Sequence, residues 1–212
     1  MKLRLRSMGL ELFEDCVGFL DGTIFSCKLK PFCDNWGIQY VNHWKKAYSL
    51  QATIISDDLG RIVHFSSIYP TSVHDERCRH ATRIWHNSGK SSHYITRACQ
   101  RRRYIQPTYA KLWCHIEEFL ARKEFLIADS AYPETYNCMV PYKTPRGRVW
   151  SGERRFNRKF YSSRIWIEQT IRGLKHRFAY LKNISNKGNL SQDWLKEVYK
   201  RSASVVILHN LL

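Results

Sequence analysis

Two short apolar runs of this sequence each stop at an aspartate. Val17–Leu20 is followed by Asp21, and Phe125–Ala128 is followed by Asp129. Short apolar runs bounded by turn residues are typical of buried strands, and residues at the carboxyl end of such a strand project from the edge of the sheet. We therefore expect two buried strands, each with an aspartate at its carboxyl end.

Two strand-like segments lie between these runs. Tyr48–Ile55 and Arg61–Tyr69 are rich in strand-forming residues, and the sequence Asp-Asp-Leu-Gly separates them. Strand formers joined by turn residues are typical of an antiparallel hairpin. We interpret Asp57 and Asp58 as residues of the turn and not as metal ligands.

Helical patterns dominate the last third of the chain. We expect one long helix from about Asn157 to Lys182 and a last helix over Leu190–Leu212. An early hairpin followed by alternating elements predicts an α/β fold, in which helices pack on a mixed sheet. No interdomain linker stands out, so we expect a single domain over residues 1–212.

A polar, aromatic and basic segment at 83–123 is predicted to be an insertion before the fourth strand. It contains Arg101, Arg102 and Arg103 among several aromatic residues. Rings stack on bases and cations bind phosphates, so the segment suits a nucleic-acid surface. A small helical subdomain would have the same composition, and both interpretations stay open.

The charge of the chain restricts its partners. The sequence has 35 Lys and Arg against 18 Asp and Glu, a formal net charge of +17. Such an excess favours nucleic acid over a membrane as partner. No apolar run approaches the roughly 18 residues that cross a bilayer, so we expect a soluble intracellular protein without a membrane partner. The seven cysteines include no Cys-x-x-Cys pair, which predicts buried reduced thiols and disfavours a zinc-binding module.

The long predicted helix carries two stripes. Apolar residues recur with helical spacing, which predicts a face toward the core; they are Ile167, Ile171, Leu174 and Phe178. The neighbouring stripe is expected to be an exposed edge; it consists of Arg164, Glu168, Arg172 and Lys175. On an isolated helix Glu168 would pair with Arg164 and Arg172. Alternatively, the cations contact phosphate and the carboxylate is available for chemistry.

Three carboxylates of this sequence are able to converge. If the first and fourth strands are neighbours, Asp21 and Asp129 emerge at one sheet edge, and a helix across that edge brings Glu168 to them. Three acids repel one another unless cations bind between them, and Mg²⁺ or Mn²⁺ suits carboxylate oxygen. Such a site supports phosphodiester chemistry with two metals roughly 3.5–4 Å apart. Considered separately, Asp21 also suits a turn before Gly22, and Asp129 also suits hydrogen bonds to the loop that follows it.

Six segments in order match a known family. The chain resembles the DDE superfamily endonuclease domain of PIF/Harbinger-type transposases over nearly its full length. The matching segments are CVGFLDGT at 16–23, YSLQATIISDDLGRIVHFSSIYPTSVHDERC at 48–78, IADSAYP at 127–133, VPYKTP at 140–145, ERRFNRKFYSSRIWIEQTIRGLKHRFAYL at 153–181 and VVILHN at 205–210.

The resemblance implies an RNase H-like fold and a catalytic triad that binds divalent metal, carried here by Asp21, Asp129 and Glu168. Two ions of Mg²⁺ or Mn²⁺ are the expected cofactor. The family commonly has Asp75, which we expect beside the metal ligands or at a helix start, and His74 is expected to be structural. Three basic residues of the long helix become predicted phosphate contacts: Arg164, Arg172 and Lys175.

The resemblance also implies partners and a location. DNA is the expected partner, family members often work with a separate Myb-like DNA-binding protein, and the expected location is the nucleus. A homo-oligomer is compatible with the sequence. The chain starts near the first catalytic strand, so we expect the family's amino-terminal helix-turn-helix to be absent. The alternative function is a domesticated or truncated relative that binds DNA or protein without cutting.

Overall fold

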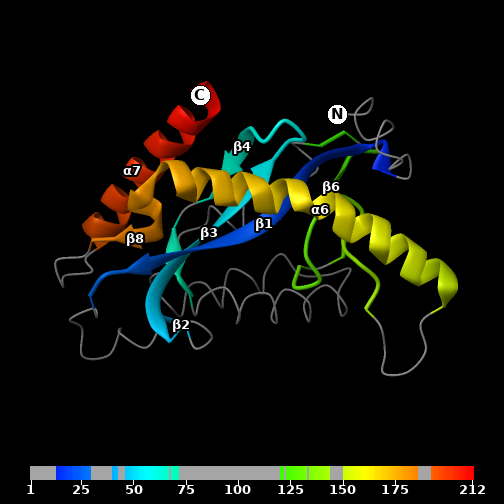
Figure 1. Cartoon of the computed structure of the whole chain (residues 1–212), viewed down its shortest axis with the longest axis horizontal. Helices are drawn as coiled ribbons and strands as arrows, with labels where there is room; N and C mark the ends of the chain where they lie inside the picture. Colours follow the sequence, from blue (N-terminus) through cyan, green and yellow to red (C-terminus); the bar gives the residue numbers. More distant parts are fainter. Residues whose placement is uncertain are drawn as a thin grey trace, which may run out of the picture.

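The strand β1 (Cys16–Cys27) is the centre of one mixed sheet of eight strands, on which long helices pack (Figure 1). The computed structural model describes residues 13–29, 40–42, 46–66, 68–71, 120–121, 123–132, 134–143, 150–185 and 192–212. The other strands are β2 (Val41–Asn42), β3 (Ala47–Ser56), β4 (Ile62–Phe65), β5 (Tyr69–Pro70), β6 (Phe125–Ile127), β7 (Cys138–Met139) and β8 (Asn183–Ile184). The helices are α6 (Ser151–Arg177), the short 3₁₀ helix η3 (Ala179–Lys182) and α7 (Gln192–Leu211).

The sheet order is β2-β3-β1-β6-β7, with β4 and β5 paired to β3 and β8 paired to β1. β1 runs antiparallel to β3 and parallel to β6 and β8. This mixed sheet flanked by helices confirms the predicted α/β class and is consistent with an RNase H-like fold. The predicted insertion at 83–123, apart from residues 120, 121 and 123, lies outside the described residues.

The two faces of β1 belong to different apolar clusters, because side chains alternate along a strand. Phe19 and Phe25 are fully buried in the larger cluster, which α6 and α7 cover. Leu20 points to the opposite face, where it packs with Leu126 and Val140. Asp21 has the same parity as Phe19 and therefore belongs to the face that α6 covers.

The prediction that the first strand stops at Asp21 is wrong, since β1 continues to Cys27. β3 pairs with the whole of this stretch, with Asp21 opposite Ile54 and Ser26 opposite Ser49. The sequence Asp-Gly-Thr has the local chemistry of a turn, but the ladder of backbone hydrogen bonds to β3 outweighs that preference. Asp21 is consequently in the middle of the central strand.

The predicted hairpin is confirmed, with β3 and β4 antiparallel and Ile54 opposite Phe65. Asp57 is a turn residue as predicted: its Oδ1 accepts the backbone N–H groups of Leu59 at 3.0 Å and Arg61 at 2.8 Å. Gly60 has a φ of 78°, a left-handed conformation that suits glycine. The turn therefore needs Asp57 for its hydrogen bonds and Gly60 for its backbone.

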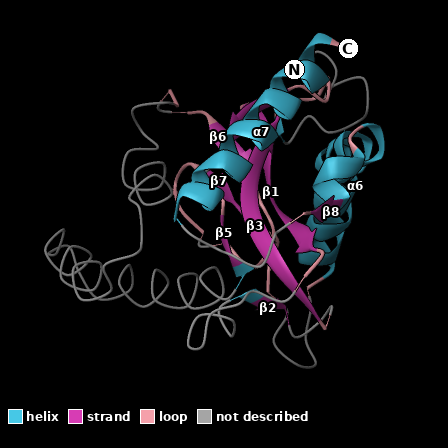
Figure 2. Ribbon diagram, turned by 90° about the vertical axis from the view of Figure 1, so that its left-hand side faces the viewer, coloured by secondary structure: helices cyan, strands magenta, loops and turns pink. Residues whose placement is uncertain are grey.

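The two long helices match the predicted positions, and Figure 2 shows α6 on one side of the sheet. α6 begins at Ser151, six residues before the expected start at Asn157, and η3 follows it to Lys182. The apolar stripe is confirmed where Ile167 and Leu174 are fully buried. No described helix combines the length and the apolar character that a membrane-spanning segment needs.

Candidate active site

The pairing of β1 with β6 brings Asp21 and Asp129 together. The two strands run parallel, and Phe19 is opposite Ile127, the last residue of β6. Each aspartate lies two residues further along its own segment, so both side chains fall on the face to which Phe19 and Ile127 point. The first and fourth predicted strands are therefore neighbours, which is the condition for the two acids to meet. We call Asp21 and Asp129 the carboxylate pair.

The guanidinium of Arg164, on α6, lies between the two carboxylates. Its Nη2 is 3.3 Å from Oδ2 of Asp21, and its Nη1 is 3.8 Å from Oδ1 of Asp129. The arginine side chain is only 9% exposed, against 20% for Asp21 and 42% for Asp129. One buried cation thus bridges both acids.

The position of Arg164 corrects the expectation that it lies on an exposed edge. The buried residues of α6 include Phe160, Arg164, Ile167 and Leu174, which follow one another at helical spacing. Arg164 is four residues after Phe160 and three before Ile167, so it faces the sheet. That spacing, with one cation among apolar residues, was the sequence signal for its buried position.

Local backbone groups hold each member of the carboxylate pair. Oδ1 of Asp21 accepts the N–H of Gly22 at 2.8 Å. Oδ1 of Asp129 accepts the backbone N–H of Ser130 and, at 3.1 Å, its hydroxyl. Both aspartates therefore make the local hydrogen bonds that their sequence context suggested, and they also lie near each other.

Burial and several neighbouring groups shift the pKa of Asp21. Burial raises the pKa of its carboxyl above the ordinary value, and this is the largest effect. The guanidinium of Arg164 and the N–H of Gly22 act in the opposite direction, while the carboxylates of Asp129 and Glu168 raise the pKa further. Asp21 is thus electrostatically coupled to both other members of the predicted triad.

Glu168 lies one helical turn after Arg164, with its side chain exposed. Among the described residues, no ion pair joins it to Arg164 or Arg172. Within the described ranges, no three His, Cys, Asp or Glu side chains are grouped so that they could hold a metal ion. The structure therefore brings Asp21 and Asp129 together and leaves Glu168 beside them, and its role as a ligand stays a prediction.

The remaining predicted site residues have different surroundings. Arg172 is exposed on α6. Lys175 is half-buried, its Nζ donates to the carbonyl oxygen of Ile24 in β1 at 2.8 Å, and it lies 5.5 Å from the centre of the Phe25 ring. Five predicted residues lie outside the described part of the chain: His74, Asp75, Arg101, Arg102 and Arg103.

Three exposed arginines near the start of α6 were not among the predicted site residues. Arg154, Arg155 and Arg158 are neighbours on one helix face, and we call them the basic ridge. The cluster ERRFNRKF at 153–160 was their signal in the sequence. The sequence of that cluster alone does not predict where these arginines lie relative to the carboxylate pair, because this depends on the position of α6.

Gly22 lets other groups approach the strand beside the carboxylate pair. A Cβ atom at this position would lie 3.1 Å from Nε2 of Gln51 and 3.5 Å from the hydroxyl of Tyr132. Tyr132 is buried, and its backbone N–H donates to the carbonyl oxygen of Asp129 at 3.0 Å. Gly22 and the turn after Asp129 therefore pack against each other.

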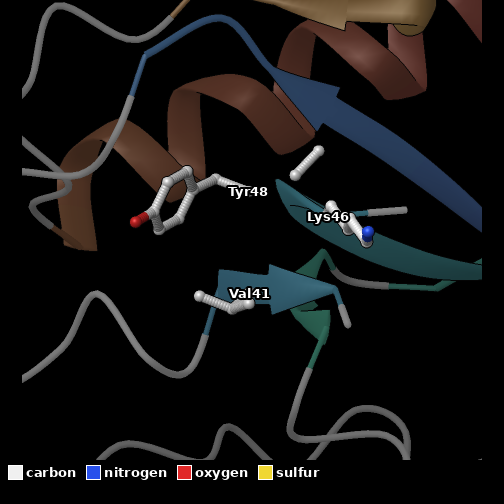
Figure 3. Close-up of a pocket in the computed structure, with 4 residues that line it drawn as sticks. Val41, Lys46 and Tyr48 are labelled. Atoms are coloured by element: carbon white, nitrogen blue, oxygen red, sulfur yellow. The ribbon is translucent and has the colours of Figure 1, made fainter. Parts of the chain in front are cut away.

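A pocket at the other end of β3 is separate from these acids. It is lined by Val41, Lys46, Ala47 and Tyr48, without a carboxylate (Figure 3). Tyr48 lies six residues before Ile54, the partner of Asp21, which is roughly 20 Å along a strand. The pocket is not part of the candidate site.

Comparison with known proteins identifies the family. A family model described as DDE superfamily endonuclease matches residues 20–210, a range that includes Asp21, Asp129 and Glu168. Neither a curated protein nor a solved structure matches the chain. Since the match covers nearly the whole sequence and the fold agrees with it, the chain belongs to the DDE superfamily endonuclease family.

Proposed function

We propose that this protein is a divalent-metal-dependent DNA endonuclease of the DDE transposase type, with Asp21, Asp129 and Glu168 as its triad. The observation that carries the proposal is the carboxylate pair, two acids from neighbouring strands that face one helix. The family match supports an endonuclease. The narrower PIF/Harbinger affiliation, the nuclear location and the Myb-like partner are proposed from the resemblance of the segments alone.

The donor set of the carboxylate pair fits a hard cation. Both acids offer carboxylate oxygen, the ligand that Mg²⁺ and Mn²⁺ prefer. A positive group already lies between them, since Arg164 is in contact with both. Asp21 and Asp129 would hold the ion, and Glu168 on the adjacent helical turn would be the third ligand. A bound ion of this kind activates a water or hydroxyl nucleophile and stabilises the leaving oxygen of a phosphodiester.

The chain's own residues would position the acids and the DNA. Gly22 and Ser130 donate hydrogen bonds to Asp21 and Asp129, and this fixes the direction of each carboxylate. The basic ridge and Arg172 lie on the same helix as Glu168 and would bind the phosphate backbone.

One observation favours the alternative function, a relative that binds DNA or protein without cutting. The ion pairs of Arg164 offset part of the charge of the carboxylate pair, as ion pairs in a purely structural cluster would. In that case the acids stabilise the packing of α6 on β1, and the basic surface alone contacts the partner.

Plasmid nicking in the presence of Mg²⁺ or Mn²⁺ tests the proposal. We expect nicking by the unchanged protein, and a decrease of at least about 100-fold for Asp21→Asn, Asp129→Asn and Glu168→Gln, because each removes a ligand charge. Asp193→Asn is the matched control, since Asp193 is an exposed acid paired with Lys196 on α7. Nicking that survives all three triad changes would sink the assignment. DNA binding that weakens with salt, without metal uptake or nicking, would favour the alternative.

A further inference from the structure

Arg164 is the most unusual residue of the site, because it is a buried cation with an incomplete set of partners. Its two terminal nitrogens are 3.3 and 3.8 Å from carboxylate oxygens, longer than the roughly 2.7–2.9 Å of a strong charge-assisted hydrogen bond. Its Nε is buried and has no hydrogen-bond partner among the described residues. A buried arginine normally satisfies these donors, so its present contacts hold it less firmly than its burial suggests.

The positive and negative charges around Arg164 also do not balance. One guanidinium faces two carboxylates, and Glu168 adds a third negative group that acts on Asp21. The cluster therefore retains an attraction for further positive charge. Removing two like charges from water next to each other is costly unless a cation accompanies them, which explains why a cation is present at this position.

A divalent ion shared by the carboxylate pair would compete with Arg164 for the same two carboxylates. Hard divalent ions contact carboxylate oxygen directly, at about 2 Å. The guanidinium is in contact with one oxygen of each acid, so a shared ion would lie close to a like charge. The repulsion between the two cations favours an arrangement in which only one of them contacts the pair.

We infer that Arg164 is a positioning residue: it is the resident counter-ion of Asp21 and Asp129 in the metal-free protein, and it withdraws from the pair when a divalent cation binds. This inference rests on the proposed function for the identity of the cation. It adds that this protein binds metal in competition with its own arginine, so that the apparent metal affinity is lower than the carboxylates alone would give.

Calorimetric titration with Mn²⁺ tests the competition. Arg164→Gln removes the competing charge, and we expect it to bind Mn²⁺ roughly tenfold more tightly, the factor expected if the arginine is away from the pair in about one metal-free molecule in ten. Arg164→Lys keeps the charge, so its affinity should remain near that of the unchanged protein. A residue that only supports the fold would lower the affinity when it is replaced.

Arg177→Gln is the matched control for this titration. Arg177 is on the same helix, exposed, and loses the same charge, but it lies 13 residues from Arg164, about 20 Å along a helix. Its replacement should leave the Mn²⁺ affinity within about twofold of the original, because charges at that distance are largely screened by salt. An equal gain in affinity for Arg177→Gln would show a general charge effect and would overturn the inference.

A measurement on the unchanged protein covers the case in which the Arg164 variants do not fold. The Nε–H signal of Arg164 in ¹⁵N NMR spectra should shift and exchange faster with water as Mg²⁺ is added. The signal of Arg61, whose Nε is hydrogen-bonded to Asp57 at 2.6 Å, should not change. An Arg164 signal that stays constant while Mg²⁺ binds would overturn the inference.

The outcomes also separate this inference from the proposed function. If the unchanged protein binds Mn²⁺ and nicks DNA while Arg164→Gln binds Mn²⁺ no more tightly, the competition is refuted and the endonuclease stands. If Arg164→Gln binds Mn²⁺ more tightly but neither protein nicks DNA, the competition stands and the endonuclease is refuted. If neither protein takes up Mn²⁺, both are refuted.

Discussion

At the scale of single residues, basic side chains of α6 that look alike in the sequence have different roles. Arg164 is buried against Asp21 and Asp129, and Lys175 contacts the backbone and a ring of β1, whereas Arg172 is exposed. Their roles follow from the angular position of each residue on the helix, not from its charge. A substitution is therefore informative only when these positions are considered.

The first prediction separates Lys175 from Arg172. Lys175→Ala removes a hydrogen bond to the Ile24 carbonyl and a cation–π interaction with Phe25, so we expect a decrease of about 1–3 kcal/mol in the free energy of unfolding, measured with urea. Arg172→Ala should change the stability by less than about 0.5 kcal/mol and weaken DNA binding instead. The opposite pattern would show that Lys175, not Arg172, binds phosphate.

The second prediction concerns two buried thiols. Burial raises the pKa of Cys16 and of Cys138 to about 12 from an ordinary value of 9.0, so their thiolate fraction at pH 8 falls on the order of a thousandfold. We expect both to resist iodoacetamide in the folded protein and to react after unfolding in urea. Peptide mapping by mass spectrometry follows each cysteine separately. Rapid alkylation of either one without denaturant would contradict its burial.

At the scale of elements, two asparagines fasten the long helices to extended segments in the same way. The side chain of Asn210 on α7 bonds the N–H and the carbonyl oxygen of Ile62 in β4, at 2.8 and 2.9 Å. The side chain of Asn157 on α6 bonds the same two groups of Tyr142, at 2.9 and 3.0 Å. Each side-chain amide replaces a missing strand partner, because it offers one donor and one acceptor.

The third prediction compares these two asparagines. The Ile62 bonds are partly buried, whereas the Tyr142 bonds are exposed, so water replaces the latter at lower cost. We expect Asn210→Ala to lower the free energy of unfolding by about 1–3 kcal/mol and Asn157→Ala by less than about 1 kcal/mol. Thermal or urea unfolding gives both values. Equal decreases would mean that burial does not decide the contribution of this arrangement.

The elements also show what the sequence predicts and what it does not. Strand-forming residues and turn residues predicted the hairpin, and helical spacing predicted the core face of α6, because these are local properties of the chain. The continuation of β1 through Asp21 was not predictable, since it depends on pairing with β3 and not on the Asp-Gly-Thr sequence. The bridge by Arg164 was missed for a similar reason: a cation is usually exposed, and only its two partners on β1 and beyond β6 explain its burial.

At the scale of the whole molecule, part of the net charge of +17 lies on the basic ridge, near the amino-terminal end of α6. Arg164 and Glu168 follow on the same helix. A duplex that lies along α6 would thus bind the ridge with its backbone while a phosphodiester reaches the acids.

The fourth prediction measures the contribution of the basic ridge. Replacing Arg154, Arg155 and Arg158 together by Gln should weaken DNA binding and decrease the slope of log K against log salt by about 0.9 for each phosphate that is no longer neutralised. Mn²⁺ uptake should be unchanged. The matched control removes three cations from α7 instead: Lys196, Lys200 and Arg201. If the control lowers the slope equally, DNA does not follow α6.

Because Asp21 lies in the middle of β1, the backbone of Asp21 is held more firmly than that of Asp129. The backbone of Asp21 is paired with β3, whereas Asp129 lies two residues after the last residue of β6 and opens a turn. If the distance between the two carboxylates changes, we therefore expect Asp129 to move and Asp21 to stay in place. Substitutions in the turn at 129–132 of related chains would accordingly change the distance between the two carboxylates without disturbing the sheet.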